Sequence, residues 1–214
     1  MTRVPEHLAS DMTRLVVTLF ESYGSGASYV GPRIASALGL PFHEQAFSSE
    51  QLEDAVAKRE SEGVLARVFG AMGGAYSSFA GIEGPGVALA QRDNYSIVME
   101  NTRSVKQMAR EGGVILGRNG ALILADRPAT LHVRLDGPLD RRIARAAQES
   151  GLSSDRAAKR QKREDQLRAE MSIELYGWDP RQDDRYDLVV NTGTMDLDTC
   201  VAVIVQAVRI KAGA

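Results

Sequence analysis

Short apolar runs alternate along this chain with longer segments whose apolar residues recur every three or four positions. The runs at residues 14–20, 114–116 and 131–135 are rich in Val, Leu and Ile and predict buried strands. Residues 40–45 and 186–193 predict two further strands. Strands that alternate with helices are typical of a parallel sheet with helices on both faces. We therefore expect an α/β fold of this kind.

The helical segments follow the predicted strands. A glycine turn precedes the helix expected at residues 26–39, and an amphipathic helix is expected over residues 92–113. Two charged helices are expected at residues 138–151 and 153–177, and a closing helix follows the last strand. Serines ahead of an acidic turn predict one more helix over residues 48–72.

The composition is that of an ordinary globular protein. The chain has 214 residues, of which 43% are hydrophobic and 25% charged, so we expect a single domain over residues 1–214. A formal net charge of −2 gives no overall attraction to nucleic acid, and Cys200, the sole cysteine, excludes an intrachain disulfide. The sequence has no secretory pattern and no apolar run of membrane length. We expect a cytoplasmic protein that binds neither nucleic acid nor a membrane.

A glycine-rich turn, ESYGSGAS at residues 21–28, lies between the first strand and the first helix. Such a junction binds phosphate when backbone N–H groups converge on it and the helix dipole adds to them. The common motif G-x-x-x-x-G-K-[ST] is incomplete here, because Glu21 replaces the first glycine and Ala27 the lysine, although Gly26 and Ser28 are present. A phosphate cradle and a structural turn are both compatible with this stretch.

The segment at residues 140–170 is locally basic, and its arginines have two interpretations. They can form a solvated helix face with ion pairs three and four residues apart, or they can neutralise phosphate charge. Arg118 follows a predicted strand end, where ligands of α/β sheets bind; the alternative is a surface arginine in a turn. Asp136, at the end of another strand, could reach a magnesium-bound water or cap the next helix, and we expect the cap. No metal site built by the protein is predicted.

Four stretches resemble the cytidylate kinase-like family, P-loop proteins related to nucleoside monophosphate kinases. Residues 18–42 are similar to the family's strand, Y-G-S-G-G loop and following helix, which ends near L-G-I-P-F. Residues 112–145 resemble its V-G-R…D-R-P…H-V segment, residues 162–170 its D-x-x-R on the lid helix, and residues 186–193 its last strand. Family members lack the P-loop lysine as a group, and Ala27 agrees with that trait.

The resemblance implies a three-layer P-loop kinase-like fold, with a central parallel sheet flanked by helices and a helical lid at about residues 146–182. It also implies an acceptor-side insert at about residues 48–110 and an extended or disordered N-terminus at residues 1–13. The implied reaction transfers the γ-phosphate of ATP, which brings Mg²⁺ with it, to a small acceptor. A cytidylate-type nucleotide is the default acceptor.

The resemblance assigns roles to individual residues. Arg118 would bind the acceptor. The residues expected to hold the donor phosphates are Gly24, Ser25, Gly26, Ala27 and Ser28. The arginines expected to neutralise charge during transfer are Arg142, Arg145, Arg163 and Arg168.

The chain departs from the family pattern at the phosphate end. Family members usually have S-R-E before the loop, where this chain has FES at residues 20–22, and Gly-Arg-Glu after it, where this chain has ASY at residues 27–29. In cytidylate kinases the arginine that corresponds to Arg118 stands between two aspartates, and here Leu116 and Asn119 replace them.

These departures leave two other functions open. One is a catalytically inactive protein that binds a nucleotide or a partner on the same fold, and the other is a kinase for a small non-nucleotide acceptor. A homo-oligomer is also open, because the apolar glycine-rich stretch at residues 69–81 suits an interface as well as a lid.

Overall fold

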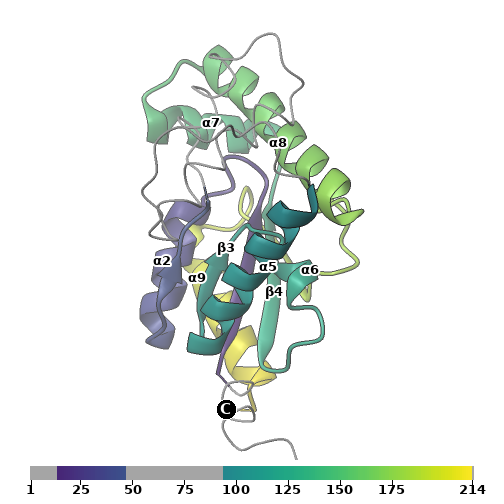
Figure 1. Cartoon of the computed structure of the whole chain (residues 1–214). Helices are drawn as coiled ribbons and strands as arrows, with labels where there is room; N and C mark the ends of the chain where they lie inside the picture. Colours follow the sequence, from purple (N-terminus) through teal and green to yellow (C-terminus); the bar gives the residue numbers. More distant parts are fainter. Residues whose placement is uncertain (1–13, 47–93, 214) are drawn as a thin grey trace, which may run out of the picture.

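Five strands form one parallel sheet in the order β2-β3-β1-β4-β5. The computed structural model describes residues 14–46 and 94–213 (Figure 1). The strands are β1 (Val16–Glu21), β2 (Phe42–His43), β3 (Gly113–Leu116), β4 (Thr130–Asp136) and β5 (Leu188–Asn191). The predicted α/β fold is confirmed, and a strand is found within or around each of the five predicted runs.

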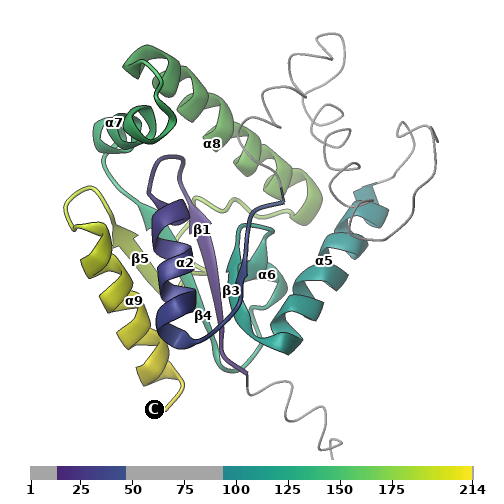
Figure 2. The same cartoon turned by 90° about the vertical axis from the view of Figure 1, so that its left-hand side faces the viewer.

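Helices cover both faces of this sheet. The described helices are α2 (Ala27–Leu38), α5 (Asn94–Glu111), α6 (Gly120–Ile123), α7 (Leu139–Ser150), α8 (Ser154–Tyr176) and α9 (Leu197–Lys211). Helices α2 and α9 lie together on one face, with α5 and α6 on the other, while α7 and α8 cross above the sheet (Figure 2). The expected helix at residues 48–72, most of the insert and the N-terminus at residues 1–13 lie outside the described residues.

Successive side chains of β1 point to opposite faces of the sheet and contribute to a hydrophobic core on each face. Val17 and Leu19 pack with α2 and α9, whereas Val16 packs with α5 and the segment that follows α6. Neighbouring residues of a strand point to opposite faces, so a continuous apolar run is what a strand covered on both sides requires. Cys200 is fully buried in the first of these cores, as a packed thiol.

The carboxyl ends of the central strands define where a ligand can bind. Strand β1 lies between β3 and β4, and the glycine-rich turn leaves β1 at the edge where all strands end. In open α/β sheets this edge is where ligands bind, near the point at which the chain crosses from one side of the sheet to the other. Helices α7 and α8 lie over the same edge (Figure 2).

The core beneath α9 gives a first test of the fold. Ile204 is fully buried, so Ile204→Val is expected to lower the free energy of unfolding by about 1 kcal/mol through loss of one packed methylene. Urea denaturation followed by circular dichroism measures this change. Ile210→Val is the matched control, because Ile210 lies on the same helix and is 68% exposed. Equal shifts for both variants would contradict the described packing of α9.

Candidate functional site

The glycine-rich turn has a backbone that only glycine adopts easily. Gly24 has φ 78° and Gly26 has φ 85°, both in the left-handed region. A Cβ on Gly24 would also lie 2.3 Å from the backbone oxygen of Arg142, which belongs to α7. The shape of the turn and the direct packing of α7 on it therefore both require glycine at position 24.

Several polar atoms of this turn have no partner in the described part of the chain. They are the backbone N–H groups of Gly24, Gly26 and Ser28, together with the fully buried hydroxyl of Ser25. Helix α2 begins after Gly26 without a side-chain cap, so its first N–H groups carry partial positive charge. Because buried polar atoms are normally hydrogen-bonded, this arrangement fits a phosphate ligand.

The next N–H group, that of Ala27, is occupied by a carboxylate of the chain. Glu21 Oε2 accepts a hydrogen bond from it at 3.1 Å, while Gln45 Nε2 donates to Glu21 Oε1 at 2.9 Å. The Ala27 side chain is fully buried in the core beneath α2. Position 27 thus contributes no charge, and Glu21 holds one of the N–H groups that a phosphate would use.

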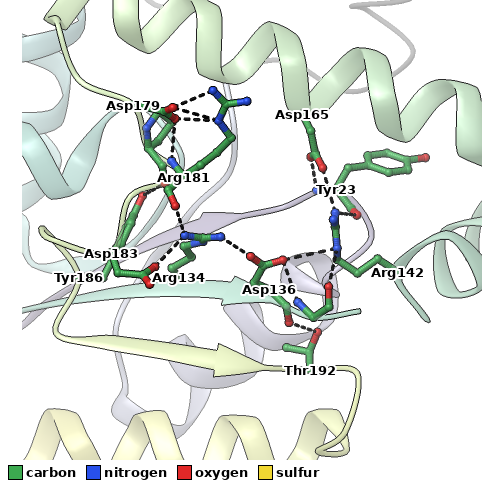
Figure 3. Close-up of polar contacts among 12 residues, drawn as sticks. Tyr23, Arg134, Asp136, Arg142, Asp165, Asp179, Arg181, Asp183, Tyr186 and Thr192 are labelled. Carbon is green, nitrogen blue, oxygen red and sulfur yellow. Dashed lines mark hydrogen bonds and ion pairs between the residues drawn. The ribbon is translucent and has the colours of Figure 1, made fainter. Parts of the chain in front are cut away.

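A second carboxylate reaches the turn from the lid helix α8. Asp165 Oδ1 accepts from the Tyr23 N–H at 2.7 Å, and its Oδ2 accepts from Arg142 Nη1 at 2.9 Å (Figure 3). Arg142 also donates to the backbone oxygens of Tyr23 and Gly137, at 3.0 Å in both cases. The Arg142 side chain is 10% exposed, so a largely buried ion pair joins α7 and α8 to the glycine-rich turn.

Arg145, one turn beyond Arg142 on α7, binds the same region from another side. It donates to the Gly24 backbone oxygen at 2.9 Å and to the Thr192 backbone oxygen at 2.5 Å. Thr192 follows β5, so Arg145 connects the turn to the segment that leads into α9.

Arg168 on α8 lies at the other end of the turn. It pairs with Glu164, one turn earlier on the helix, at 2.9 Å, and Glu164 is fully buried. Arg168 Nη1 also donates to the Glu21 backbone oxygen at 3.2 Å and lies 3.6 Å from Glu21 Oε1. Three of the four predicted arginines thus meet at the turn, whereas Arg163 is half-buried on α8 and lies outside both groups of cavity-lining residues described below.

The predicted cap by Asp136 is wrong. Helix α7 begins after Pro138 without a side-chain cap. Asp136 instead pairs with Arg134 on its own strand and lies 3.5 Å from Arg142 Nε (Figure 3). The two guanidinium groups take one carboxylate oxygen each, Arg134 on Oδ2 and Arg142 on Oδ1.

Arg118 has an unusual backbone conformation just after β3. It has φ 57°, and the following Asn119 has φ 55°. Asn101 Nδ2 donates to the Arg118 backbone oxygen at 2.9 Å, and Ser172 donates to Asn119 Oδ1 at 2.7 Å, so neighbouring elements hold both residues in place. Left-handed conformations of non-glycine residues cost energy and occur often at ligand sites, which makes this turn a candidate binding element.

Two cavities meet beside the glycine-rich turn. One, of about 370 Å³, lies over the turn itself and is lined by Gly24, Gly26 and Ser28 among others. The other, of about 100 Å³, lies beside Arg118 and Tyr176. Glu21, Gln45 and Arg168 line both cavities.

The cavity beside Arg118 has an apolar wall and a few polar groups. The apolar residues larger than alanine are Phe20, Ile97, Leu167, Met171, Leu175 and Pro180. Asn101 Nδ2 donates to the Tyr176 hydroxyl at 2.6 Å. Burial raises the pKa of Tyr176 more than the hydrogen bonds with Asn101 and Thr102 lower it.

The described ranges contain neither a cluster of metal ligands nor a membrane-spanning helix. No three His, Cys, Asp or Glu side chains of residues 14–46 and 94–213 are grouped as a metal ion would require. Within the same ranges, no helix combines the length and the apolar character needed to cross a bilayer. The exposed Ser28 presents a hydroxyl group of the turn at the wall of the larger cavity.

Comparison with known proteins places the chain in a family. A family model described as the cytidylate kinase-like family matches residues 16–194. The chain belongs to the cytidylate kinase-like family. The resemblance found in the sequence is thus confirmed, and the matched range includes the glycine-rich turn, Arg118, α7 and α8.

Individual relatives of this cytidylate kinase-like chain differ in how much they share with it. A cytidylate kinase of Ignicoccus hospitalis is 26% identical over 194 residues, covering 88% of this chain and 96% of that one. A protein of Corynebacterium glutamicum named uronate isomerase is 42% identical over 113 residues, covering 53% of this chain. The chain spans 22% of the length of that second relative.

A solved structure shares the fold. The crystal structure of an uncharacterized protein from Eubacterium ventriosum superposes with a TM-score of 0.64 at 19% identity. The superposition covers 91% of this chain and 98% of that one, so the two folds agree over nearly their whole length.

Sequence reasoning did not assign a role to several residues of this cytidylate kinase-like site. In the sequence, Glu21 stands out only as the replacement for a P-loop glycine, and Asp165 only as part of the D-x-x-R motif. In the structure, both carboxylates accept hydrogen bonds from N–H groups of the turn. Gln45 and Asn101 carried no signal at all, since their contacts depend on how β2 and α5 are placed beside the turn. The acidic residue in the place of a P-loop glycine is the sequence feature that could have indicated a carboxylate contact within the turn.

Proposed function

We propose that the protein is an ATP-binding, nucleoside monophosphate kinase-like phosphotransferase whose default acceptor is a cytidylate-type nucleotide. The observation that supports this most is the pair of cavities that meet beside the glycine-rich turn. Phosphoryl transfer needs two substrates held in line, with cations and N–H donors on the oxygens that carry charge. One cavity would take the donor and the other the acceptor.

The donor side would rest on backbone groups. The N–H groups of Gly24, Gly26 and Ser28 and the hydroxyl of Ser25 would bind phosphate oxygens, and the dipole of α2 would add to their attraction. When bound, Mg²⁺ neutralises phosphate charge. The Ala27 N–H would become available only if Glu21 moved away.

The acceptor side would rest on Arg118 and the apolar wall. The wall suits the flat face of a nucleotide base, while Asn101 and Tyr176 offer polar atoms to its edge. Arg168 borders both cavities and would neutralise charge between the substrates. Helices α7 and α8 cover the turn and would exclude water, which otherwise competes as phosphoryl acceptor.

A catalytically inactive binding protein is the second candidate. The contact between Glu21 and the Ala27 N–H favours it, because a carboxylate replaces both the lysine charge and part of the phosphate cradle. A kinase for a non-nucleotide acceptor is the third, favoured by the mainly apolar wall beside Arg118.

ATP consumption with a panel of acceptors separates these candidates. The kinase proposal predicts ADP formation that depends on a nucleoside monophosphate, with CMP tested first. ADP formation only with a non-nucleotide acceptor would support the third candidate. Binding of ATP without acceptor-dependent turnover would support the inactive protein.

Arg118→Ala tests the acceptor side directly. Loss of one guanidinium contact is expected to raise the KM for the acceptor by about tenfold or more, and to leave the Kd of Mg·ATP within about twofold. Arg103→Ala, on an exposed position of α5, is the control and should change neither constant. An unchanged acceptor KM in Arg118→Ala would remove Arg118 from the site.

A further inference from the structure

The cavity over the glycine-rich turn is acidic for a phosphate site. Among the described residues that line it, the carboxylates are Glu21, Glu44 and Glu149 and the guanidiniums are Arg160 and Arg168. Arg168 already pairs with the buried Glu164 at 2.9 Å. Arg142 and Arg145 donate to backbone oxygens of the turn rather than lining the cavity. The protein groups that line this cavity thus bring more negative than positive charge to it.

Glu21 contacts the glycine-rich turn directly through the Ala27 N–H. Its side chain is 14% exposed, and its two oxygens contact the Ala27 N–H at 3.1 Å and Gln45 Nε2 at 2.9 Å. Arg168 Nη1 lies 3.6 Å from Oε1, but Arg168 also pairs with Glu164, so it is shared between two carboxylates. The Ala27 N–H belongs to the first turn of α2, where phosphates bind in glycine-loop sites. A phosphate and the Glu21 carboxylate would compete for the same donor, and they would repel each other wherever both remained.

Desolvation and the negative charge of Glu21 both act on Glu149, a second carboxylate of this cavity wall. Although the residue is exposed, desolvation by surrounding protein atoms raises the pKa of its carboxyl group, Arg145 lowers it, and repulsion from Glu21 raises it. The net pKa is above the ordinary value, so the nearby guanidinium does not offset the other two effects.

Building on the proposed function, we propose that Glu21 is a specificity-determining residue of the donor site. It discriminates against a polyphosphate that carries no divalent cation and allows the cation-complexed form to bind. A bare polyphosphate would have to displace Glu21 from the Ala27 N–H and remain beside a carboxylate in a cavity that holds too little positive charge. A divalent cation bound to the ligand supplies that charge, so Glu21 can stay near it without net repulsion.

Titration calorimetry of the full chain with tripolyphosphate, with and without Mg²⁺, tests this proposal. The unsubstituted chain should bind about tenfold or more tightly with Mg²⁺ than without it. Glu21→Gln keeps the size of the side chain and an oxygen for the Ala27 N–H but removes the charge. This variant should bind Mg²⁺-free tripolyphosphate about tenfold more tightly than the unsubstituted chain, and its ratio of affinities should fall toward one.

Control variants and contrary results separate this proposal from the proposed function. Glu111→Gln, at the far end of α5, removes one carboxylate elsewhere and should keep the original ratio. Glu21→Ala must change the ratio in the same direction, which covers a Glu21→Gln chain that fails to fold. An unchanged ratio in the Glu21 variants would overturn the role of Glu21 and leave the donor site standing. Absence of tripolyphosphate binding by every variant, with or without Mg²⁺, would overturn both.

Discussion

Arg142→Ala is expected to lower the free energy of unfolding by about 3 kcal/mol, because it leaves buried charge without its partner. The Arg142 side chain is 10% exposed and binds Asp165 at 2.9 Å and the Tyr23 backbone oxygen at 3.0 Å (Figure 3). Its removal also breaks the link that α7 and α8 make to the turn, so the affinity for Mg·ATP should fall as well. Urea denaturation and calorimetric titration measure the two effects.

Arg141→Ala is the matched control for this prediction. Arg141 is the preceding residue of α7 and is exposed, so its loss should change the free energy of unfolding by less than about 0.5 kcal/mol. A double-mutant cycle with Asp165→Asn isolates the ion pair from the packing of α7. Equal stability of Arg142→Ala and Arg141→Ala would show that the buried network does not fasten the lid.

Gly24→Ala is the second change with a large expected effect. Alanine at φ 78° is strained by roughly 1–2 kcal/mol, and its Cβ would lie 2.3 Å from the Arg142 backbone oxygen, which forces α7 away. Together we expect a loss of about 3 kcal/mol in the free energy of unfolding. The affinity for Mg·ATP should fall by about tenfold or more, because the N–H groups of the turn lose their arrangement.

Gly39→Ala separates strain from packing in this experiment. Gly39 ends α2 at φ 64°, and a Cβ there would meet no atom within 4 Å. This variant should lose about 1 kcal/mol of stability from backbone strain alone and should bind Mg·ATP normally. Equal losses of stability and of binding in the two variants would contradict the close packing of α7 on the turn.

The fold could be predicted largely from the local pattern of apolar residues and glycines in the sequence. Runs such as residues 14–20 are apolar throughout because both faces of the central strands are covered, and this requirement is visible without any knowledge of distant contacts. Glycines mark the turn before α2 in the same way, since Gly24 and Gly26 adopt a backbone that other residues resist.

The side-chain contacts of the site could be predicted from the sequence only in part, because many of them join residues far apart along the chain. Asp165 binds the Tyr23 N–H across 142 residues of sequence, and Arg168 binds the Glu21 backbone oxygen across 147. Sequence spacing identified Arg168 through its motif, but it could not show that a carboxylate would occupy the Ala27 N–H. The prediction for Asp136 failed for a different reason, since Arg134 on the same strand and Arg142 on the following helix both pair with its carboxylate.

The lysine-less turn also has an internal explanation. Ala27 packs into the core, and its N–H group binds Glu21, while Arg142 and Arg145 hold the backbone of the turn. The turn is therefore shaped by residues of the protein itself, without a lysine side chain. A backbone shaped in advance can bind a ligand with little loss of entropy, which partly offsets the missing charge.

Calorimetric titration of the full chain with Mg·ATP at moderate salt tests the central claim most directly. The account predicts binding with a Kd in the micromolar range, through the N–H groups of Gly24, Gly26 and Ser28. The absence of binding up to several millimolar would contradict it. The glycine-rich turn would then be a structural connection between β1 and α2, and the protein would not act on ATP.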